Sequence, residues 1–403
     1  MYKETNLYKF FIRLFLSLIF FIFLSLYFSL QKISLVFLIS IIFFFLRFNY
    51  KKIILTNLII FSLLLKIIII PFQTKNTSID PSRAVIYEKH FLYGIKNLDL
   101  KYETINGDLS SLEESFKKKY FNLKKKRTIN INTDHLGFRN TIKPNDADYI
   151  FVGDSFLQLG NLTQNNILNF VLNNSFGLKT YNAGVGATDI YHYFETIKFF
   201  KDKLQFKNKK FIMLIFQGND FLNYQVEKKD NYHKYIDNQF FHYYFKFKIF
   251  FNFHPLIKYV LHYVDKDKKD FVQVYEFKVK KKDVLFKFDY IYEDKQKIYS
   301  LNNIFKKYKD YLPDSIIFIP TKFEIYCDFI VNKECPKTEH FSILKNEPLL
   351  SDVKVLNSKD FFKKKAAKLI NSENKLIYGI DDTHLNEIGV KYLSEFIFMN
   401  LEK

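Results

Sequence analysis

The stretch DYIFVGDSFLQLGN (148–161) decides the fold of this chain. It opens with an apolar run at 149–152 that stops abruptly at Gly153-Asp154-Ser155. Short apolar runs bounded by turn residues are typical of buried parallel strands. Similar runs recur at 211–216 and 315–319, so the sequence predicts strands there, and LKTYNAG (178–184) and KLIYGI (375–380) are two further candidate strands.

Amphipathic stretches lie between the predicted strands. Two of them, 190–200 and 360–370, have the spacing of helices. A chain that alternates strand and helix favours an α/β fold, a doubly wound parallel sheet with helices on both faces. The working site of such a sheet lies at the carboxyl ends of its strands. Ser155 follows one of these ends, so its hydroxyl is a candidate nucleophile.

The first seventy residues are strongly apolar, with runs at 8–30, 33–48 and 53–70. The first run is long enough to cross a bilayer. No small-residue cleavage site follows it, which argues against a cleaved signal peptide. The sequence therefore predicts a transmembrane region over 1–71 with about three spans, and a lipid bilayer as a partner.

Basic residues indicate the orientation of these spans. They cluster at the start of the first run and between the second and third runs, whereas only Lys32 lies between the first and second. Placing the richer clusters in the cytoplasm puts everything after residue 71 on the periplasmic side of the inner membrane. If 33–48 lies only at the membrane interface, the chain crosses the bilayer twice instead of three times, and the large domain faces the cytoplasm.

The remaining chain divides into a polar lead-in segment, 72–140, and an α/β domain, 141–403, with an insertion at about 225–305. The insertion is dense in aromatic and basic side chains, as in FFHYYFKFKIFFNFH (240–254). Two interpretations stay open. The aromatic residues pack against the main domain, or they form a cap or apolar face over the site or the membrane.

The net charge of +19 does not by itself indicate a nucleic-acid partner. A nucleic-acid binder needs its basic residues clustered on one face or groove, whereas the lysines here are spread along the chain. Abundant Lys, Asn, Ile, Phe and Tyr, with 11 Gly and no Trp, is a pattern expected from A/T-rich codons. We therefore expect no nucleic acid among the partners.

Three further motifs follow predicted strands. Asn182-Ala183-Gly184-Val185-Gly186 is a glycine turn able to present backbone N–H groups. Gln217-Gly218-Asn219-Asp220 places an amide side chain after a strand, and Asp381-Asp382-Thr383-His384 precedes a predicted helix at 386–400. If each closes a strand, all four motifs meet at one edge of the sheet.

This set of residues fits acyl transfer. A serine nucleophile needs a base within hydrogen-bond reach and a third group to orient that base. We expect His384 to be the base for Ser155 and Asp381, three residues before it, to hold the imidazole, since an Asp two residues before would tend to point away. The candidate oxyanion donors are the N–H groups of Ser155 and Gly186 and the amide of Asn219. Asp154 and Asp220 are their neighbours.

At these residues the chain resembles the SGNH (GDSL-type) hydrolase superfamily, whose four blocks fall on Ser155, Gly186, Asn219, and Asp381 with His384. TDHLGFRN (133–140) and IPTKFEIY (319–326) also look like its membrane-anchored bacterial branch. The resemblance covers roughly 131–403 and implies a three-layer α/β/α, flavodoxin-like fold and ester chemistry without metal or cofactor. Two departures are Gln217, where the family has glycine, and a compact second block in which Gly184 or the Ala187 N–H could replace Gly186.

The resemblance further implies a class of substrate. Family members anchored in this way often act on O-acetyl groups of envelope or exported polysaccharide, and some receive the acyl group from a multispan membrane acyltransferase. The sequence thus predicts a membrane-anchored serine esterase or O-acyltransferase. The alternatives are a lipase or lysophospholipase fed from the bilayer and an inactive scaffold with the same fold. The intact set of motif residues argues against the scaffold.

The chain has two cysteines, Cys327 and Cys335, close enough in sequence for a local loop to join them. In an oxidising periplasm we expect a disulfide. If the domain is cytoplasmic, two separate thiols are expected instead.

Overall fold

The computed structural model describes residues 85–88, 91–94, 96–104, 107–110, 112–123, 127–186, 188–221, 274–287, 301–330, 335 and 338–401. All of them belong to one of two compact units, Pro71–Lys403, the other being Met1–Ile70. The three predicted spans lie outside the described residues. Among the described helices, none combines the length and the apolar character that crossing a membrane requires.

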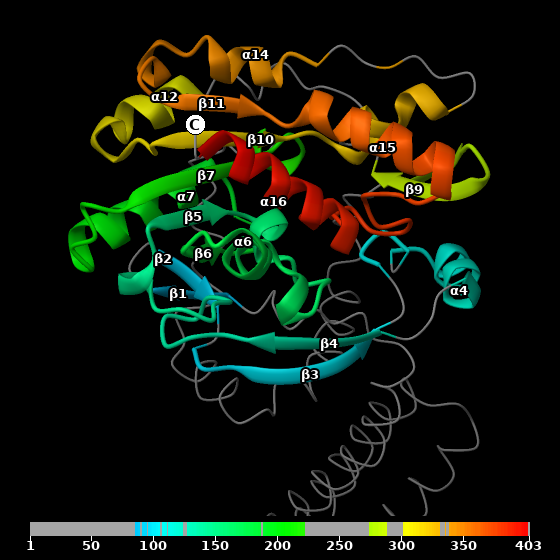
Figure 1. The fold of residues 1–403 in the computed structure, drawn as a ribbon, viewed down its shortest axis with the longest axis horizontal. Helices are drawn as coiled ribbons and strands as arrows, with labels where there is room; N and C mark the ends of the chain where they lie inside the picture. The colour runs from blue at the N-terminus through cyan, green and yellow to red at the C-terminus, as the bar shows by residue number, and fades with distance from the viewer. Residues whose placement is uncertain are drawn as a thin grey trace, which may run out of the picture. The chain divides into compact units, whose positions relative to one another are not determined.

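A parallel sheet of five strands forms the centre of the domain, in the order β11-β10-β7-β5-β6 (Figure 1). Counted along the chain the order is 2-1-3-4-5, one of the two common doubly wound arrangements. The α/β prediction is therefore confirmed. The strands are β5 (Tyr149–Gly153), β6 (Thr180–Gly184), β7 (Lys210–Phe216), β10 (Ser315–Ile319) and β11 (Lys354–Asn357).

Four of the five predicted strands are confirmed, and the one at 375–380 is wrong. That stretch is a buried loop with a single isolated bridge, Tyr378 to Leu385. Its backbone is held by side chains instead of a neighbouring strand, since the Ile377 N–H donates to Tyr326 Oη at 2.7 Å. The actual fifth strand, β11, lies at the sheet edge and is only half-buried, so it lacks the apolar run that marks β5, β7 and β10.

Successive residues of each strand point to opposite sides of the sheet, so both faces carry apolar side chains. Helices cover both faces. Phe151 and Leu214 pack into one core, and Ile150 and Met213 pack into the other. The first core is shared with α6 (Leu168–Phe176), α13 (Lys322–Tyr326), α15 (Lys359–Glu373) and α16 (Glu387–Leu401). The second is shared with α7 (Ile190–Lys198), α12 (Leu301–Lys307) and α14 (His340–Lys345).

The lead-in segment contains regular structure that the sequence did not indicate. Two antiparallel pairs occur there, β1 (Val85–Glu88) with β2 (Phe91–Gly94) and β3 (Asp99–Thr104) with β4 (Arg127–Asn132). The helix α4 (Glu114–Leu123) lies between β3 and β4 in the chain.

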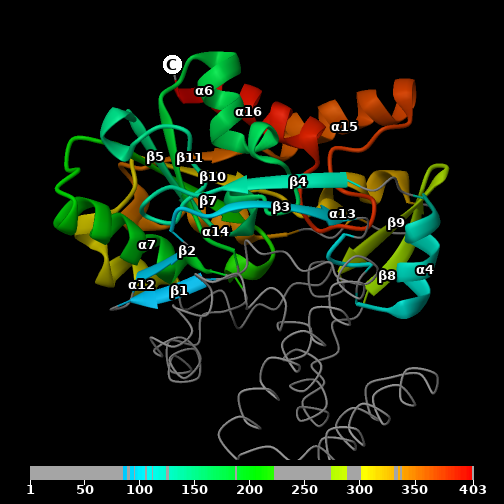
Figure 2. The ribbon, with the colours of Figure 1, turned by 90° about the horizontal axis from the view of Figure 1, so that it is seen from below.

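The described residues of the insertion form an antiparallel hairpin, β8 (Val274–Val279) with β9 (Lys282–Lys287), and the start of α12. Figure 2 shows α4 beside this hairpin, where Tyr120 Oη donates to Glu276 at 2.9 Å. Val284 and Phe286 are buried in the first core, so this part of the insertion packs against the domain. The aromatic stretch 240–254 lies outside the described residues.

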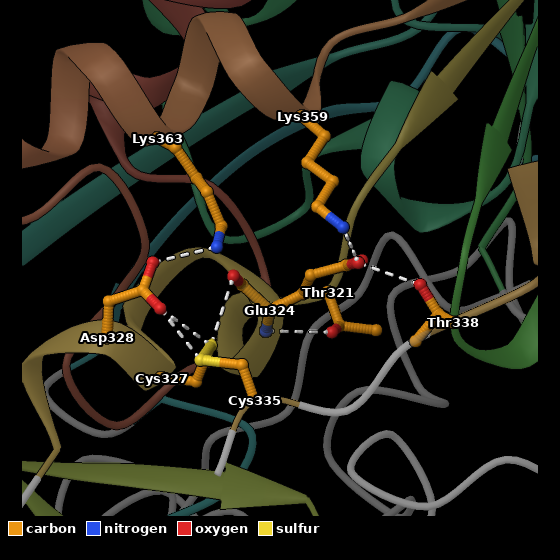
Figure 3. The surroundings of a disulfide bond; sticks show 8 residues. All are labelled: Thr321, Glu324, Cys327, Asp328, Cys335, Thr338, Lys359 and Lys363. Atoms are coloured by element: carbon orange, nitrogen blue, oxygen red, sulfur yellow. Dashed lines mark hydrogen bonds and ion pairs between the residues drawn. A yellow bond between two sulfur atoms is a disulfide. The ribbon is translucent and has the colours of Figure 1, made fainter.

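The predicted disulfide between Cys327 and Cys335 is present, with the two Cα atoms 5.4 Å apart (Figure 3). Two lysines reach from α15 toward the segment that carries it. Lys363 pairs with Asp328 at 2.8 Å, and Lys359 pairs with Glu324 of α13. The bond therefore closes a loop at a point where ion pairs already join α15 to α13 and to the turn that follows α13.

Candidate active site

Ser155 lies in a sharp turn between β5 and the short helix α5 (Ser155–Gln158). Asp154 caps this helix, and its Oδ1 accepts the Phe156 N–H at 2.8 Å. Aspartate is among the best residues for this position, because its carboxylate satisfies an amide that the helix leaves without an acceptor. The strand–cap–helix sequence thus places the Ser155 hydroxyl at the carboxyl edge of the sheet.

His384 contacts Ser155 across the sheet edge. Its Nε2 lies 2.8 Å from Ser155 Oγ, and its Nδ1 lies 2.8 Å from Asp382 Oδ1. A carboxylate can only accept, so in the neutral ring Nδ1 carries the proton and Nε2 faces the serine hydroxyl as an acceptor. This is the geometry in which a histidine takes a proton from a serine nucleophile.

The structure corrects the expectation that Asp381 orients His384, since Asp382 holds this place. Asp382 Oδ1 also accepts the His384 backbone N–H at 2.9 Å, so the carboxylate turns back toward the ring that follows it. Asp381 is fully buried, and its Oδ2 accepts from the Gly107 N–H at 2.7 Å and from Ser110 Oγ at 2.6 Å. Its carboxylate therefore joins the histidine loop, residues 381–384, to the lead-in segment.

The electrostatic surroundings favour a protonated His384. Burial lowers the pKa of this imidazole, but the hydrogen bond to Asp382 and the charges of Asp382, Asp108 and Asp154 outweigh it and raise the pKa to about 9. An imidazolium formed during a reaction is therefore well stabilised here.

The three expected oxyanion donors gather around Ser155, but two of them are engaged. Asn219 Nδ2 donates to Asp154 Oδ2 at 3.1 Å. The Gly186 N–H donates to Gln158 Oε1 at 2.9 Å, and a Cβ on Gly186 would lie 3.7 Å from Ser155 Cβ. The Ser155 N–H is at the first position of α5, where the helix supplies no acceptor.

The alternatives to Gly186 give no additional donor in the described residues. The Gly184 N–H is taken by Asn182 Oδ1 at 2.8 Å, and Ala187 lies outside the described residues. Gly186 can serve as an oxyanion donor only after the Gln158 side chain moves away from the Gly186 N–H.

The neighbours Asp220 and Gln217 have supporting roles in the turn after β7. Asp220 is fully buried, and its Oδ2 accepts the Phe216 N–H at 2.7 Å. Gln217 Oε1 accepts the Thr321 N–H at 3.1 Å, so this side chain ties the end of β7 to the turn after β10. That bond gives a physical reason for glutamine at this position.

Arg139, in the stretch TDHLGFRN, supports the segment after Ser155. The guanidinium is only 2% exposed and donates through Nη1 to Leu159 O at 2.7 Å and through Nη2 to Leu162 O at 2.9 Å. It thereby satisfies carbonyl groups where α5 ends, which holds the segment that follows Ser155.

Two groups of three potential metal-binding side chains occur within the described ranges. In one, the sulfurs of Cys327 and Cys335 lie near Asp328, but they are joined to each other as a disulfide. The other is Asp108, Asp382 and His384. Here the carboxylate and imidazole donors are already hydrogen-bonded, so a Ser–His–Asp arrangement accounts for their closeness.

No protein-family model matches the chain, and a comparison with curated proteins finds no match either. What the site can do is therefore read from its own residues.

Proposed function

We propose that this protein is a serine esterase or O-acyltransferase that forms an acyl-enzyme on Ser155. The observation that carries this proposal is the continuous chain of hydrogen bonds from Ser155 Oγ through His384 to Asp382 Oδ1, with both contacts at 2.8 Å. Nucleophile, base and orienting carboxylate are the three groups that acyl transfer requires.

The reaction follows from this geometry. Ser155 Oγ attacks the acyl carbon while its proton passes to His384 Nε2, and Asp382 stabilises the imidazolium. The Ser155 N–H is a candidate donor to the oxyanion, and the Asn219 amide joins it once its bond to Asp154 is released. Fixed donors at this position stabilise the transition state. The imidazolium then protonates the leaving alcohol. In the second half, water or a sugar hydroxyl attacks the acyl carbon and gives its proton to His384. The bond between the acyl carbon and Ser155 Oγ then breaks, and the imidazolium returns the proton to Ser155 Oγ.

Membership of the SGNH superfamily is part of the proposal. The strand order 2-1-3-4-5 is the flavodoxin-like order that the resemblance implies, and helices cover both faces of the sheet. The four sequence blocks converge on one edge of this sheet, with one difference: the aspartate at the histidine is two residues before it.

We further propose that the protein is anchored by residues 1–71 in the inner membrane, with the domain on the periplasmic side, and acts on O-acetyl groups of envelope or exported polysaccharide. The Cys327–Cys335 disulfide supports an oxidising compartment, because such bonds are rare in cytosolic proteins. A multispan acyltransferase is the corresponding acyl donor if the enzyme transfers rather than hydrolyses.

The proposal is tested with the purified full-length protein and a fluorophosphonate probe, which reacts with activated serines. We expect one modified residue, Ser155, and hydrolysis of a chromogenic acetyl ester that Ser155→Ala removes. Ser351→Ala, an exposed serine in a turn, is the matched control and should leave both unchanged. Wild-type hydrolysis by Ser155→Ala would exclude the acyl-enzyme mechanism.

A further inference from the structure

Residues 107–110 of the lead-in segment lie directly against the histidine loop, about 270 positions further along the chain. The Leu109 and Ser110 N–H groups donate to Asp381 O at 3.1 and 3.3 Å, beside the bonds from Gly107 and Ser110 to the Asp381 carboxylate. Gly107 packs so closely that a Cβ there would be 2.2 Å from Asp381 O. The two segments therefore form one hydrogen-bonded unit.

Asp108 is the member of this loop that reaches the candidate catalytic residues. Its Oδ1 accepts the Thr383 N–H at 2.7 Å, and its own N–H donates to Asp382 Oδ2 at 3.4 Å. Asp382 thus has one carboxylate oxygen on His384 and the other on the Asp108 backbone. The rotation of the Asp382 carboxylate is fixed from both sides.

The Asp108 side chain also adds charge beside the imidazole. Its Oδ2 lies 3.9 Å from His384 Nδ1, and the two side chains are only 21% and 12% exposed. A charge at this distance and degree of burial is weakly screened by solvent. Burial and the charge of Asp382 raise the pKa of Asp108, so this charge is lost before that of an ordinary aspartate as the pH falls.

The other charged groups around the ring come from several elements. Asp154 faces it from the end of β5, and Lys322 of α13 donates to Asp382 O at 3.1 Å. Asp381 is turned to Gly107 and Ser110. Two carboxylates lie next to His384 Nδ1: Asp382 Oδ1 is 2.8 Å away and Asp108 Oδ2 is 3.9 Å away.

We propose that Asp108 is a positioning residue for the catalytic histidine. Its backbone N–H fixes the Asp382 carboxylate, and its side chain places a second negative charge beside the imidazole. This inference rests on the proposed function, in which His384 becomes an imidazolium during each turnover. The lead-in segment is then part of the active site, although it precedes the nucleophile in the chain and contributes no strand to the five-stranded sheet.

The experiment is an NMR titration of His384 in the full-length protein labelled at histidine, with the resonance assigned by His384→Gln. Asp108→Asn keeps an oxygen for the Thr383 N–H but removes the charge. We expect it to lower the pKa of His384 by about 1 and to move the rising limb of the pH–rate profile by the same amount. Asp108→Glu should restore most of both. Asp352→Asn, at an exposed turn, is the charge-matched control and should change neither.

A His384 pKa that is equal in wild type and Asp108→Asn would overturn the proposal. If Asp108→Asn does not fold, Asp108→Ser, which also keeps an acceptor oxygen without a charge, is titrated in its place and decides the question in the same way. The titration does not depend on turnover, so it is distinguishable from a failure of the proposed function, which would appear as no fluorophosphonate reaction at Ser155.

Discussion

The two sides of the candidate site are built in opposite ways. The nucleophile turn at 153–155 is held mainly by its own neighbours, since the Phe156, Leu157 and Gln158 N–H groups all donate to Asp154. The histidine loop at 381–384 is held by distant segments. The 107–110 loop bonds both of its aspartates, and Lys322 donates to the carbonyls of Leu285, Ile380 and Asp382 at 2.7, 3.2 and 3.1 Å.

This difference separates what a local sequence specifies from what the assembled fold specifies. A strand followed by a capping residue and a helix presents the same turn wherever it occurs. The histidine loop has no regular structure of its own, so its geometry depends on contacts that form only when the domain is complete. We therefore expect substitutions in distant segments to affect His384 more than Ser155.

The sharpest test of the comparison is the pair Asp382→Asn and Asp381→Asn. Asp382→Asn should lower kcat by on the order of 10⁴, because the amide favours the wrong imidazole tautomer. Asp381→Asn keeps an acceptor for Gly107 and should lower kcat by about tenfold or less, while destabilising the fold by about 1–3 kcal/mol through its weakened buried hydrogen bonds. Ester hydrolysis and thermal unfolding measure the two effects separately. The reverse ranking in kcat would mean that Asp381 is the orienting group during turnover.

Asn219→Ala tests the nucleophile side. Removing one oxyanion donor should lower kcat by about 10² to 10³. Asn174→Ala on α6, whose amide donates to its own helix at Phe170 O, is the matched control and should leave kcat unchanged. An equal effect of the two substitutions would remove Asn219 from the oxyanion site.

The same distinction explains how far the sequence could predict the structure. β5, β7 and β10 are nearly continuous apolar runs, so their pattern alone located them, whereas β6, TYNAG, was located as a short stretch that ends at a glycine turn. Leu376, Ile377 and Tyr378 in the stretch 375–380 are buried too, but the hydroxyl of Tyr326 and the amide of Asn386 bind its backbone in place of a neighbouring strand. Local pattern cannot distinguish these two ways of satisfying a buried backbone.

The exchange of Asp381 and Asp382 has a similar cause. Adjacent aspartates look alike in a local sequence, and the choice between them depends on which one the lead-in segment occupies. Gly107 and Ser110 bind the Asp381 carboxylate from 274 and 271 residues away. The lead-in segment has no clear periodicity, so this contact left no signal in the sequence.

The pH dependence tests the histidine side of the site on its own, because the raised pKa is that of His384. With a His384 pKa of about 9, kcat/KM should rise about tenfold per pH unit from pH 7 and level off near pH 9, since a general base must be neutral. Stability should change in the opposite direction. The folded pKa lies above the ordinary value of 6.5, so this contribution is complete below pH 6.5 and is lost as the pH rises through 9. A rate profile that levels off near pH 6.5 would contradict this assignment.

Gly107→Ala perturbs the histidine loop from the lead-in side. The added Cβ would meet Asp381 O at 2.2 Å, which is backbone and cannot move without shifting the loop. We expect about a tenfold loss of kcat/KM, together with reduced thermal stability. Gly177→Ala is the matched control, because it is strained by a φ of 72° but has nothing within 4 Å of the new Cβ. It should lower stability by about 1 kcal/mol and leave kcat/KM unchanged.

Removing the disulfide should have the smallest effect on activity. It tests whether this bond is among the distant contacts that hold the histidine loop. Cys327 and Cys335 close a short loop just after α13, the helix that also carries Lys322. Cys327→Ser with Cys335→Ser should lower the free energy of unfolding by roughly 2–3 kcal/mol, the value for closing such a loop. Lys322 and its carbonyl partners do not need the bond, since the α13–α15 contacts at Glu324 and Lys359 remain. We therefore expect kcat within about twofold of wild type, measured by ester hydrolysis alongside urea unfolding. A large fall in kcat would place the disulfide among the contacts that hold His384.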